Sequence, residues 1–439
     1  MSTGRLEVIH YPDRNNDFSK SVDLKIGQKT IMTPSFCIRL KNSEELDLLL
    51  RLKSKYSLSF ISTYVVRLLD TPRTLYSKIR AMPQLSLYGS AMEEPFSSSL
   101  GRDLIFIDPA LEYLHYHAEN TLPKIASLFF LPKILRDYAQ RCIRERKVRE
   151  KKDFQKWQDA FYRRFWTDIY EDDSKRTRLI RDIQTLEIKN KADVLIPPAP
   201  LITSSHLLDI AILINERSRE FARGKRESAD YFLLRVDALR KDEIMDRIKQ
   251  HIESSDETRL TVFKFKYMNL NSEERALEKT AYKSLLMELS LIAQHTENKV
   301  FMLLEGANQI FPSALTGFDI VSSSFNGDKE DRHSRGERSP FAKWYDPEYM
   351  IHRSREELMQ IINNNGNIVP CNCPICATPA SFLTDDFIEY NQNVKLHYLF
   401  SRNTEMKEIF EAVKQKTTRM GVDKLQRSQL KNLVDLIPA

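Results

Sequence analysis

Three apolar runs decide the fold class of this chain: Tyr231-Phe-Leu-Leu-Arg-Val236, Leu260-Thr-Val-Phe-Lys-Phe265 and Val300-Phe-Met-Leu-Leu304. Each run is short and bounded by polar residues, as expected of a buried strand. The segments between them, Lys241–Glu253 and Ser272–Thr296, have the length and pattern of helices. Strands that alternate with helices at this spacing predict parallel strands joined by crossover helices.

Further strand-like runs extend the pattern in both directions. They are Leu58–Val66, Leu85–Tyr88, Leu104–Ile107, Val194–Ile196 and Phe318–Val321. Together with the first three they make eight strands, which predicts an α/β fold of the TIM-like (β/α)8 barrel type. A doubly wound open sheet would produce a similar pattern, so this alternative stays open.

The order of these segments predicts four regions. We expect the barrel to comprise residues 1–133 and 191–365, interrupted by a charged helical insertion at 134–190. A zinc-binding region and C-terminal helices should follow at 366–439. The insertion is set apart by its composition, because it is highly charged and contains no Gly or Pro.

Composition narrows the classes of function. The 439 residues carry a formal net charge of +6, which favours an anionic partner. Only 11 residues are Gly, and neither a P-loop nor a dinucleotide-binding fingerprint is found. No apolar run is long enough to span a membrane, and the first residues lack the apolar stretch of a signal peptide. We therefore expect a cytoplasmic protein.

The strongest single signal is Cys371-Asn-Cys373-Pro-Ile-Cys376. Three cysteines within six residues indicate a metal site in a reducing compartment. Zn²⁺ prefers four nitrogen or sulfur ligands, and His397, which follows Cys376 by 21 positions, is the best fourth candidate. A site with four protein ligands has no open position, so the predicted role of zinc is structural.

The cysteine motif followed by Leu396-His397 resembles the zinc site of tRNA-guanine transglycosylases. Upstream, Gly317–Val321 is similar to the family segment with the nucleophilic aspartate, and Ile105–Asp108 to the strand that ends in a second catalytic aspartate. Thr33-Pro34-Ser35-Phe36 resembles the family's opening strand. These matches occur in the family's order and cover most of the chain outside the insertion.

The resemblance implies a base exchange through a covalent sugar–enzyme ester. Asp319 matches the nucleophile, which should end a barrel strand, and Asp108 matches the acid/base at the same end of the barrel. Without the resemblance, Asp108 before Pro109 is an ordinary helix N-cap. The predicted substrate-binding residues are Ser322, Ser323, Arg235 and Lys266.

The base pocket departs from the family pattern. Asp108 is followed by Pro109-Ala110-Leu111-Glu112 where the family has Ser-Gly-Gly-Phe, and the stretch from Phe265 to Leu270 replaces a Gly-Gly-Leu loop. Ala199 stands where the family has a base-recognising aspartate. The family also includes enzymes that insert 7-deazaguanines into DNA, and these diverge in the base pocket and lack the archaeal tRNA-binding domain. The chain ends at Ala439, soon after the zinc region, so we favour DNA over tRNA.

Several functions stay open. The leading hypothesis is exchange of guanine for a 7-deazaguanine base in nucleic acid, within a DNA-modification or anti-phage system. A tRNA-guanine transglycosylase, a glycosidase and a catalytically silent nucleic-acid-binding subunit are the alternatives. A partner protein of such a system and a homodimer are further expectations.

The insertion combines basic and aromatic residues. Seven Arg and Lys fall within residues 141–152, and Trp157, Phe161 and Phe165 recur at every fourth position. Basic residues neutralise phosphates and aromatic side chains stack on unpaired bases, which together suit a nucleic-acid clamp. The aromatic spacing equally suits a buried helix face, and we favour that interpretation for the aromatics.

Overall fold

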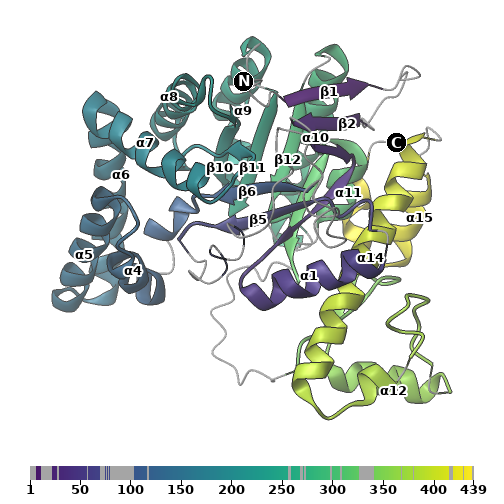
Figure 1. Ribbon diagram of the computed structural model, residues 1–439. Helices are drawn as coiled ribbons and strands as arrows, with labels where there is room; N and C mark the ends of the chain where they lie inside the picture. The colour runs from purple at the N-terminus through teal and green to yellow at the C-terminus, as the bar shows by residue number, and fades with distance from the viewer. Residues whose placement is uncertain are drawn as a thin grey trace, which may run out of the picture.

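The structure is a computed structural model of the 439-residue chain (Figure 1). It describes residues 6–10, 22–26, 29–56, 58–69, 75, 77, 79, 103–115, 118–255, 259–266, 270, 273–296, 299–306, 309–325, 341–366, 368–378, 380–414, 419–428 and 430–437. The predicted strand Leu85–Tyr88 and residues Tyr267–Asn269 of the predicted base-facing loop lie outside these residues.

A parallel sheet of ten strands forms the centre of the described part of the chain. Its order is β8-β10-β11-β12-β13-β4-β5-β6-β7-β9, and every pairing in it is parallel. The predicted α/β class with parallel strands is therefore confirmed. The strands are β4 (Ser35–Arg39), β5 (Thr63–Arg67), β6 (Leu104–Asp108), β7 (Val194–Leu195), β8 (Leu201–Ile202), β9 (Glu227–Ser228), β10 (Asp230–Arg235), β11 (Leu260–Lys266), β12 (Val300–Leu304) and β13 (Ile320–Ser324).

The two ends of this strand order come from neighbouring chain segments. Only Ala229 separates β9 from β10, and β7 and β8 lie in the single segment 194–202. Segment 194–202 therefore pairs with segment 227–235 twice, as β7 with β9 and as β8 with β10. These pairings curl the sheet so that its first and last strands return to the same part of the molecule.

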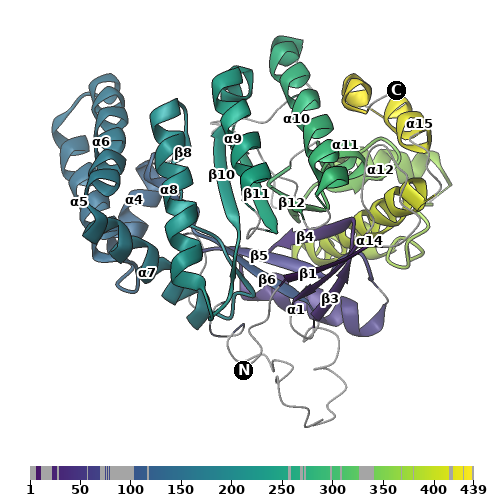
Figure 2. The ribbon, with the colours of Figure 1, turned by 90° about the horizontal axis from the view of Figure 1, so that it is seen from above.

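Helices cover the outer face of the curled sheet. Figure 2 shows α8 (Ser205–Ala222), α9 (Asp242–Ser254), α10 (Ala276–His295) and α11 (Ile310–Thr316) outside the strands. Each of these helices connects two parallel strands, and α9 and α10 correspond to the predicted helices Lys241–Glu253 and Ser272–Thr296. Ser204 caps α8 by accepting a hydrogen bond from the Leu207 N–H, a common way to satisfy a helix's first donors.

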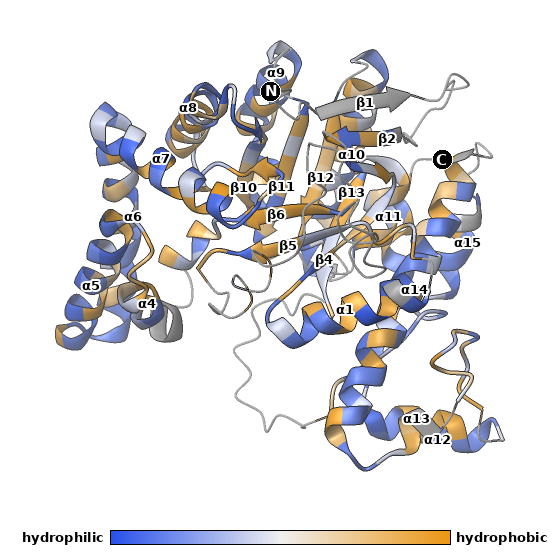
Figure 3. Ribbon diagram, viewed as in Figure 1, coloured by the Kyte–Doolittle hydropathy of each residue, from blue (hydrophilic) through white to orange (hydrophobic). Residues whose placement is uncertain are grey.

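The main core lies between the strands and these helices. Strands β4, β5, β6, β11, β12 and β13 are buried at every position, because a parallel sheet covered by helices exposes neither face. Figure 3 shows the resulting apolar strands and the mixed surfaces of the helices.

No helix among the described residues is both long and apolar enough to cross a membrane.

A small antiparallel sheet precedes the main one. It consists of β1 (Leu6–His10), β2 (Val22–Ile26) and β3 (Lys29–Met32) in that order. After β4, helix α1 (Ser43–Lys55) begins at the N-cap Asn42, whose side chain accepts from the Glu45 N–H. Helix α1 then leads to β5.

The region predicted as a charged insertion is helical. Helices α5 (Lys133–Val148), α6 (Lys151–Glu171) and α7 (Asp173–Lys189) occupy it, preceded by α4 (Ala118–Ser127). Helices α5 and α6 form a hairpin at one end of the molecule, opposite α12 (Figure 1).

The C-terminal part forms a second core beside the sheet. Trp344, Leu358, Ile362, Phe382 and Tyr390 are buried together in it. Its elements are β14 (Trp344–Asp346), β15 (Ile351–Arg353), α12 (Arg355–Asn364), α13 (Ala380–Leu383) and α14 (Phe387–Lys414), followed by α15 (Arg419–Arg427) and a 3-10 turn at Lys431–Leu436.

Candidate functional site

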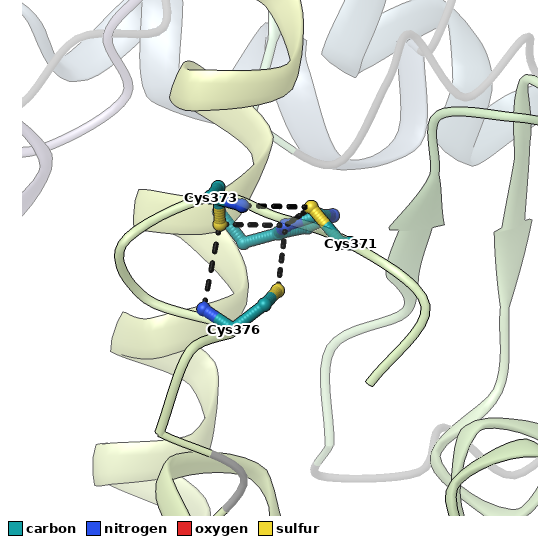
Figure 4. Close-up of side chains that lie close together, drawn as sticks. Cys371, Cys373 and Cys376 are labelled. Carbon is teal, nitrogen blue, oxygen red and sulfur yellow. Dashed lines mark hydrogen bonds between the residues drawn. The ribbon is translucent and has the colours of Figure 1, made fainter. Parts of the chain in front are cut away.

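The structure brings the four predicted metal ligands together. His397 Nδ1 lies 3.7, 3.5 and 3.2 Å from the sulfur atoms of Cys371, Cys373 and Cys376, respectively. Figure 4 shows the three cysteines converging from one tight loop beside a helix. One nitrogen and three sulfur donors in such a cluster could bind a metal ion, and the set matches the preference of Zn²⁺.

The surroundings of His397 orient it as a ligand. Its Nε2 lies 2.5 Å from the Tyr345 carbonyl oxygen, so this nitrogen donates and Nδ1 is left to face the sulfurs. The imidazole stacks on the Trp344 ring with 4.9 Å between centroids. A metal here would tie the cysteine loop to α14 and to β14, which fits the predicted structural role.

A second cluster occupies the carboxyl edge of the main sheet, where its parallel strands end. Arg39, Arg67 and Asp108 are the last residues of β4, β5 and β6, and Lys266 is the last residue of β11. Glu305 directly follows β12. With Lys264 on β11 and Glu112 on the 3-10 turn Leu111–Leu114, these seven residues form what we call the carboxyl-edge cluster.

Lys264 lies at the centre of this cluster. Its Nζ is 2.6 Å from Asp108 Oδ2, 2.5 Å from Glu112 Oε1 and 3.1 Å from Glu305 Oε1. The Lys264 side chain is fully buried, so each of these ion pairs acts in a medium of low dielectric constant. Oxygens of the three carboxylates lie within 4.8 Å of one another, and the Lys264 ammonium supplies the cation that they surround.

The carboxylates of the cluster differ in protonation tendency. Burial raises the pKa of Asp108 above its usual value, and the Lys264 ammonium offsets this only in part. Burial has the same effect on Glu305, but Arg67, Lys264 and Arg39 outweigh it and hold the Glu305 pKa well below its usual value. Glu112 is also shifted downward, because Lys264 and Lys266 together overcome its burial.

Asp108 has two further hydrogen-bond donors. Its Oδ1 accepts from the Ala110 backbone N–H at 2.9 Å and from the Tyr231 hydroxyl at 3.2 Å. The bond from Ala110 is a local turn contact. Asp108 is not a helix N-cap, because the 3-10 turn Leu111–Leu114 has Ala110 at that position and no side-chain cap. The bonds from Tyr231 and Lys264 come from distant strands, so Asp108 also belongs to the carboxyl-edge cluster.

Glu305 is the carboxylate of this cluster that reaches the surface. Its side chain is 12% exposed, whereas those of Asp108 and Glu112 are 1% and 0% exposed. Arg67 donates two hydrogen bonds to Glu305 Oε1, one from Nε at 2.8 Å and one from Nη2. Glu305 has a φ of 61°, a left-handed conformation that is costly for a residue with a side chain and that often occurs at functional sites.

The expectation that Asp319 ends a strand beside Asp108 was wrong. Asp319 precedes β13, and its Oδ2 accepts the Phe301 N–H at 2.9 Å near the start of β12. Its backbone carbonyl accepts the Ser35 N–H at the start of β4. Because β13 begins at Ile320, Asp319 lies at the amino edge of the sheet. Its hydrogen bonds there connect β13 to β12 and β4.

The other predicted substrate-binding residues have different environments. Lys266 belongs to the carboxyl-edge cluster, 3.5 Å from Glu112. Arg235 ends β10 but pairs with Asp237 at 2.6 Å. Ser322 and Ser323 are buried within β13, and the Tyr398 hydroxyl donates to Ser323 Oγ at 3.3 Å. Six residues were predicted to act in catalysis or substrate binding. Two of them, Asp108 and Lys266, form ion pairs within the carboxyl-edge cluster, with Lys264 and Glu112 respectively.

Sequence reasoning missed most members of the carboxyl-edge cluster. These are Arg39, Arg67, Glu112, Lys264 and Glu305. One signal was available, because Lys264 interrupts an otherwise apolar strand and a charge in such a strand is buried only with partners. The identity of those partners could not be read from the chain.

Comparison of the chain with protein-family models and with curated protein sequences gives no match.

Proposed function

We propose that this chain is a zinc-stabilised (β/α)8-barrel enzyme that exchanges a guanine-type base for a 7-deazaguanine in nucleic acid, with DNA favoured over tRNA. The barrel is supported by the double pairing of segment 194–202 with segment 227–235, because counting each of these segments as one strand position gives the sheet eight positions. Zinc is supported by the donor set of Cys371, Cys373, Cys376 and His397. Enzymes with this barrel have their active sites at the carboxyl edge.

The observation that carries the proposal is the pairing of carboxyl groups with opposite protonation tendencies at that edge. Asp108 has a raised pKa, whereas Glu305 is held ionised by its cationic neighbours. Two carboxyl groups whose surroundings push their pKa values apart can divide acid and nucleophile roles. Their closest oxygens lie within 4.8 Å of one another, so both can act on one glycosidic bond.

The residues of the cluster then acquire specific roles. The Glu305 carboxylate attacks C1′ of the nucleoside, and the bond from C1′ to the base nitrogen breaks as the ester forms. Asp108 donates a proton to the departing base and recovers one from the incoming base before that base displaces Glu305. This assignment moves the nucleophile from Asp319 to Glu305, because Asp319 lies at the opposite edge.

A second candidate is a catalytically silent subunit that binds nucleic acid. It is favoured by Lys264, whose ammonium contacts all three carboxylates of the cluster. Arg39 and Arg67 also pair with Glu305, and such pairing weakens a carboxylate as a nucleophile. In this alternative the cluster stabilises the barrel and has no chemical step.

A covalent-trapping assay separates the two. The zinc-loaded protein is mixed with labelled duplex DNA, single-stranded DNA or tRNA, with and without a 7-deazaguanine base, and run on a denaturing gel. We expect a shifted band that is absent from Glu305→Gln and retained by Asp319→Asn. Glu305→Asp is included because it keeps the charge and separates a lost nucleophile from a misfolded edge.

The outcomes assign the chemistry directly. A band lost in Asp319→Asn but kept in Glu305→Gln would return the nucleophile to Asp319 and refute the present assignment. Absence of a band with every nucleic acid, from folded wild-type protein with bound zinc, would favour the silent subunit. The nucleic acid that yields the band identifies the substrate class.

A further inference from the structure

The hairpin formed by α5 and α6 ends in a concentrated positive charge. Residues 141–153 include seven basic and three acidic side chains, a formal charge of +4 in a chain whose total is +6. We call this segment the arm tip. Arg144, Lys147, Lys151 and Lys152 in it are exposed.

Ion pairing within the helices does not neutralise the arm tip. Glu145 pairs with Arg149 at 2.9 Å, and the described residues give no ion pair to Lys147, Lys151 or Lys152. Helix α7 differs, because three of its five basic residues pair with nearby acids: Lys175 with Asp172, Arg176 with Asp173, and Arg178 with Asp182. The arm tip therefore offers its charge to a partner, whereas α7 shows the ordinary pattern of a solvated helix.

The aromatic residues of the hairpin are used in packing. Phe161 stacks on Tyr138 with 4.8 Å between ring centroids, and Trp157 stacks on Phe161 at the same distance. The Arg141 guanidinium lies 4.9 Å from the centroid of the Phe161 ring, and that of Arg149 lies 5.6 Å from the Trp157 ring. Phe165 is buried, and the half-buried Trp157 and Phe161 pack against the main core. The aromatic residues therefore serve mainly in packing, as predicted, and phosphate contact is the chemistry that we assign to the arm tip.

The α5–α6 hairpin is anchored beside the carboxyl-edge cluster. Helix α6 contacts the turn after β6, where Gln158 donates to the Leu114 carbonyl at 3.2 Å and Asp159 pairs with His115 at 2.6 Å. This is the turn that carries Glu112. Lys151 precedes Asp159 by eight residues, or about 12 Å along the helix. A nucleic acid at the cluster can thus extend to the arm tip.

We propose that the arm tip binds the phosphate backbone of a base-paired nucleic acid and holds it beside the carboxyl-edge cluster. The cluster supplies the reactive site, so this placement rests on the proposed function. Binding by the arm tip requires only that basic side chains release counterions from the backbone. It has no sequence preference, because the contacts are made to phosphates.

The test compares two triple variants of the full-length, zinc-loaded protein. One is Lys147→Gln/Lys151→Gln/Lys152→Gln in the arm tip. The matched control, Lys225→Gln/Lys407→Gln/Lys431→Gln, removes the same charge from exposed positions elsewhere. Affinities for a DNA duplex, an RNA duplex and a single-stranded oligonucleotide are measured by fluorescence anisotropy over a range of salt concentrations.

We expect the arm-tip variant to bind a duplex about tenfold more weakly than wild type at moderate salt. The slope of log affinity against log salt should fall in magnitude by about 3, roughly one for each lost phosphate contact. The control should bind as wild type does. The two duplex arms identify whether DNA or RNA is the source of the backbone.

Equal binding by the two triple variants would overturn the inference, as would stronger binding to the single strand than to either duplex. Failure of folded wild-type protein to bind any duplex would also overturn it. The assay needs no turnover, so duplex binding by a protein that gives no covalent band with any nucleic acid would count against the glycosyl-transfer proposal and leave the arm tip's role intact.

Discussion

The Asp319 carboxylate accepts a hydrogen bond from the Phe301 backbone N–H, 2.9 Å away, at the amino edge of the central sheet. This bond joins the residue before β13 to the start of β12, and the Asp319 side chain is buried. Asp319 therefore stabilises the sheet at the edge opposite the carboxyl-edge cluster.

From this contact we predict that Asp319→Ala lowers the free energy of unfolding by about 1–3 kcal/mol, because a buried donor loses its acceptor. Asp319→Asn keeps an oxygen acceptor and should cost less. Urea denaturation of both variants measures the effect. Nucleic-acid affinity should not change in either variant, and a selective loss of affinity without loss of stability would contradict the structural role.

Lys264 is predicted to be the most sensitive position of the carboxyl-edge cluster. Lys264→Met leaves Asp108, Glu112 and Glu305 without their shared cation and should destabilise the fold by about 3–5 kcal/mol. Lys266→Met is the matched control, because the ion pair that the described residues give Lys266, with Glu112 at 3.5 Å, is longer than those of Lys264. Unfolding curves at neutral pH should show a much larger loss for Lys264→Met. Equal losses of unfolding free energy in the two variants would mean that the three ion pairs of Lys264 stabilise the fold no more than the longer pair removed in the control.

The free energy of unfolding of the wild type should decrease at acidic pH, because protonation of Glu305 removes its ion pairs. Its folded-state pKa lies well below that of an ordinary glutamate, so Glu305 stabilises the fold at pH values above the unfolded-state pKa. This stabilisation is lost as the pH falls from about 4.5 towards the folded-state pKa. Glu305→Gln should lack this part of the acid transition, which equilibrium unfolding at a series of pH values would measure.

Glu187 should show the opposite dependence on pH. It is fully buried, and burial raises its pKa well above the usual glutamate value, although it accepts the Ile196 N–H at 3.1 Å. Stability from this group is present below the unfolded-state pKa and is lost as the pH rises through the folded-state pKa. Glu187→Gln should therefore be more stable than wild type by about 1–3 kcal/mol at pH 8, with little difference at pH 4. Parallel urea titrations at the two pH values test this.

Metal removal should be visible through Trp344, whose ring stacks on His397. A chelator should change Trp344 fluorescence and lower the free energy of unfolding by roughly 3 kcal/mol or more, because the ligands hold a loop against α14. Cys376→Ser should bind less than one zinc per chain in a metal assay. Trp344→Phe, which keeps the ligands, should retain zinc and lose the fluorescence response. Full zinc binding by Cys376→Ser would remove Cys376 from the ligand set.

The sequence by itself determined the alternation of strands and helices, the helical character of residues 134–190 and the identity of the four residues of the candidate metal site. These features are local: an apolar run, a charged segment without Gly or Pro, or three cysteines in six residues constrains its own structure. The fourth member of this cluster, His397, was also within reach, because it lies only 21 residues after Cys376.

Only the tertiary structure decided which edge of the sheet each carboxylate occupies. Asp319 stands between two apolar residues, so the sequence could not show whether a strand begins after it or ends at it. Lys264 contacts Asp108, which is 156 residues away in the sequence, and Glu305, which is 41 residues away. Strand order and register alone determine which of these distant residues become partners. Because ion pairs at a sheet edge depend on which strands are neighbours, the carboxyl-edge cluster exists only once the sheet has formed.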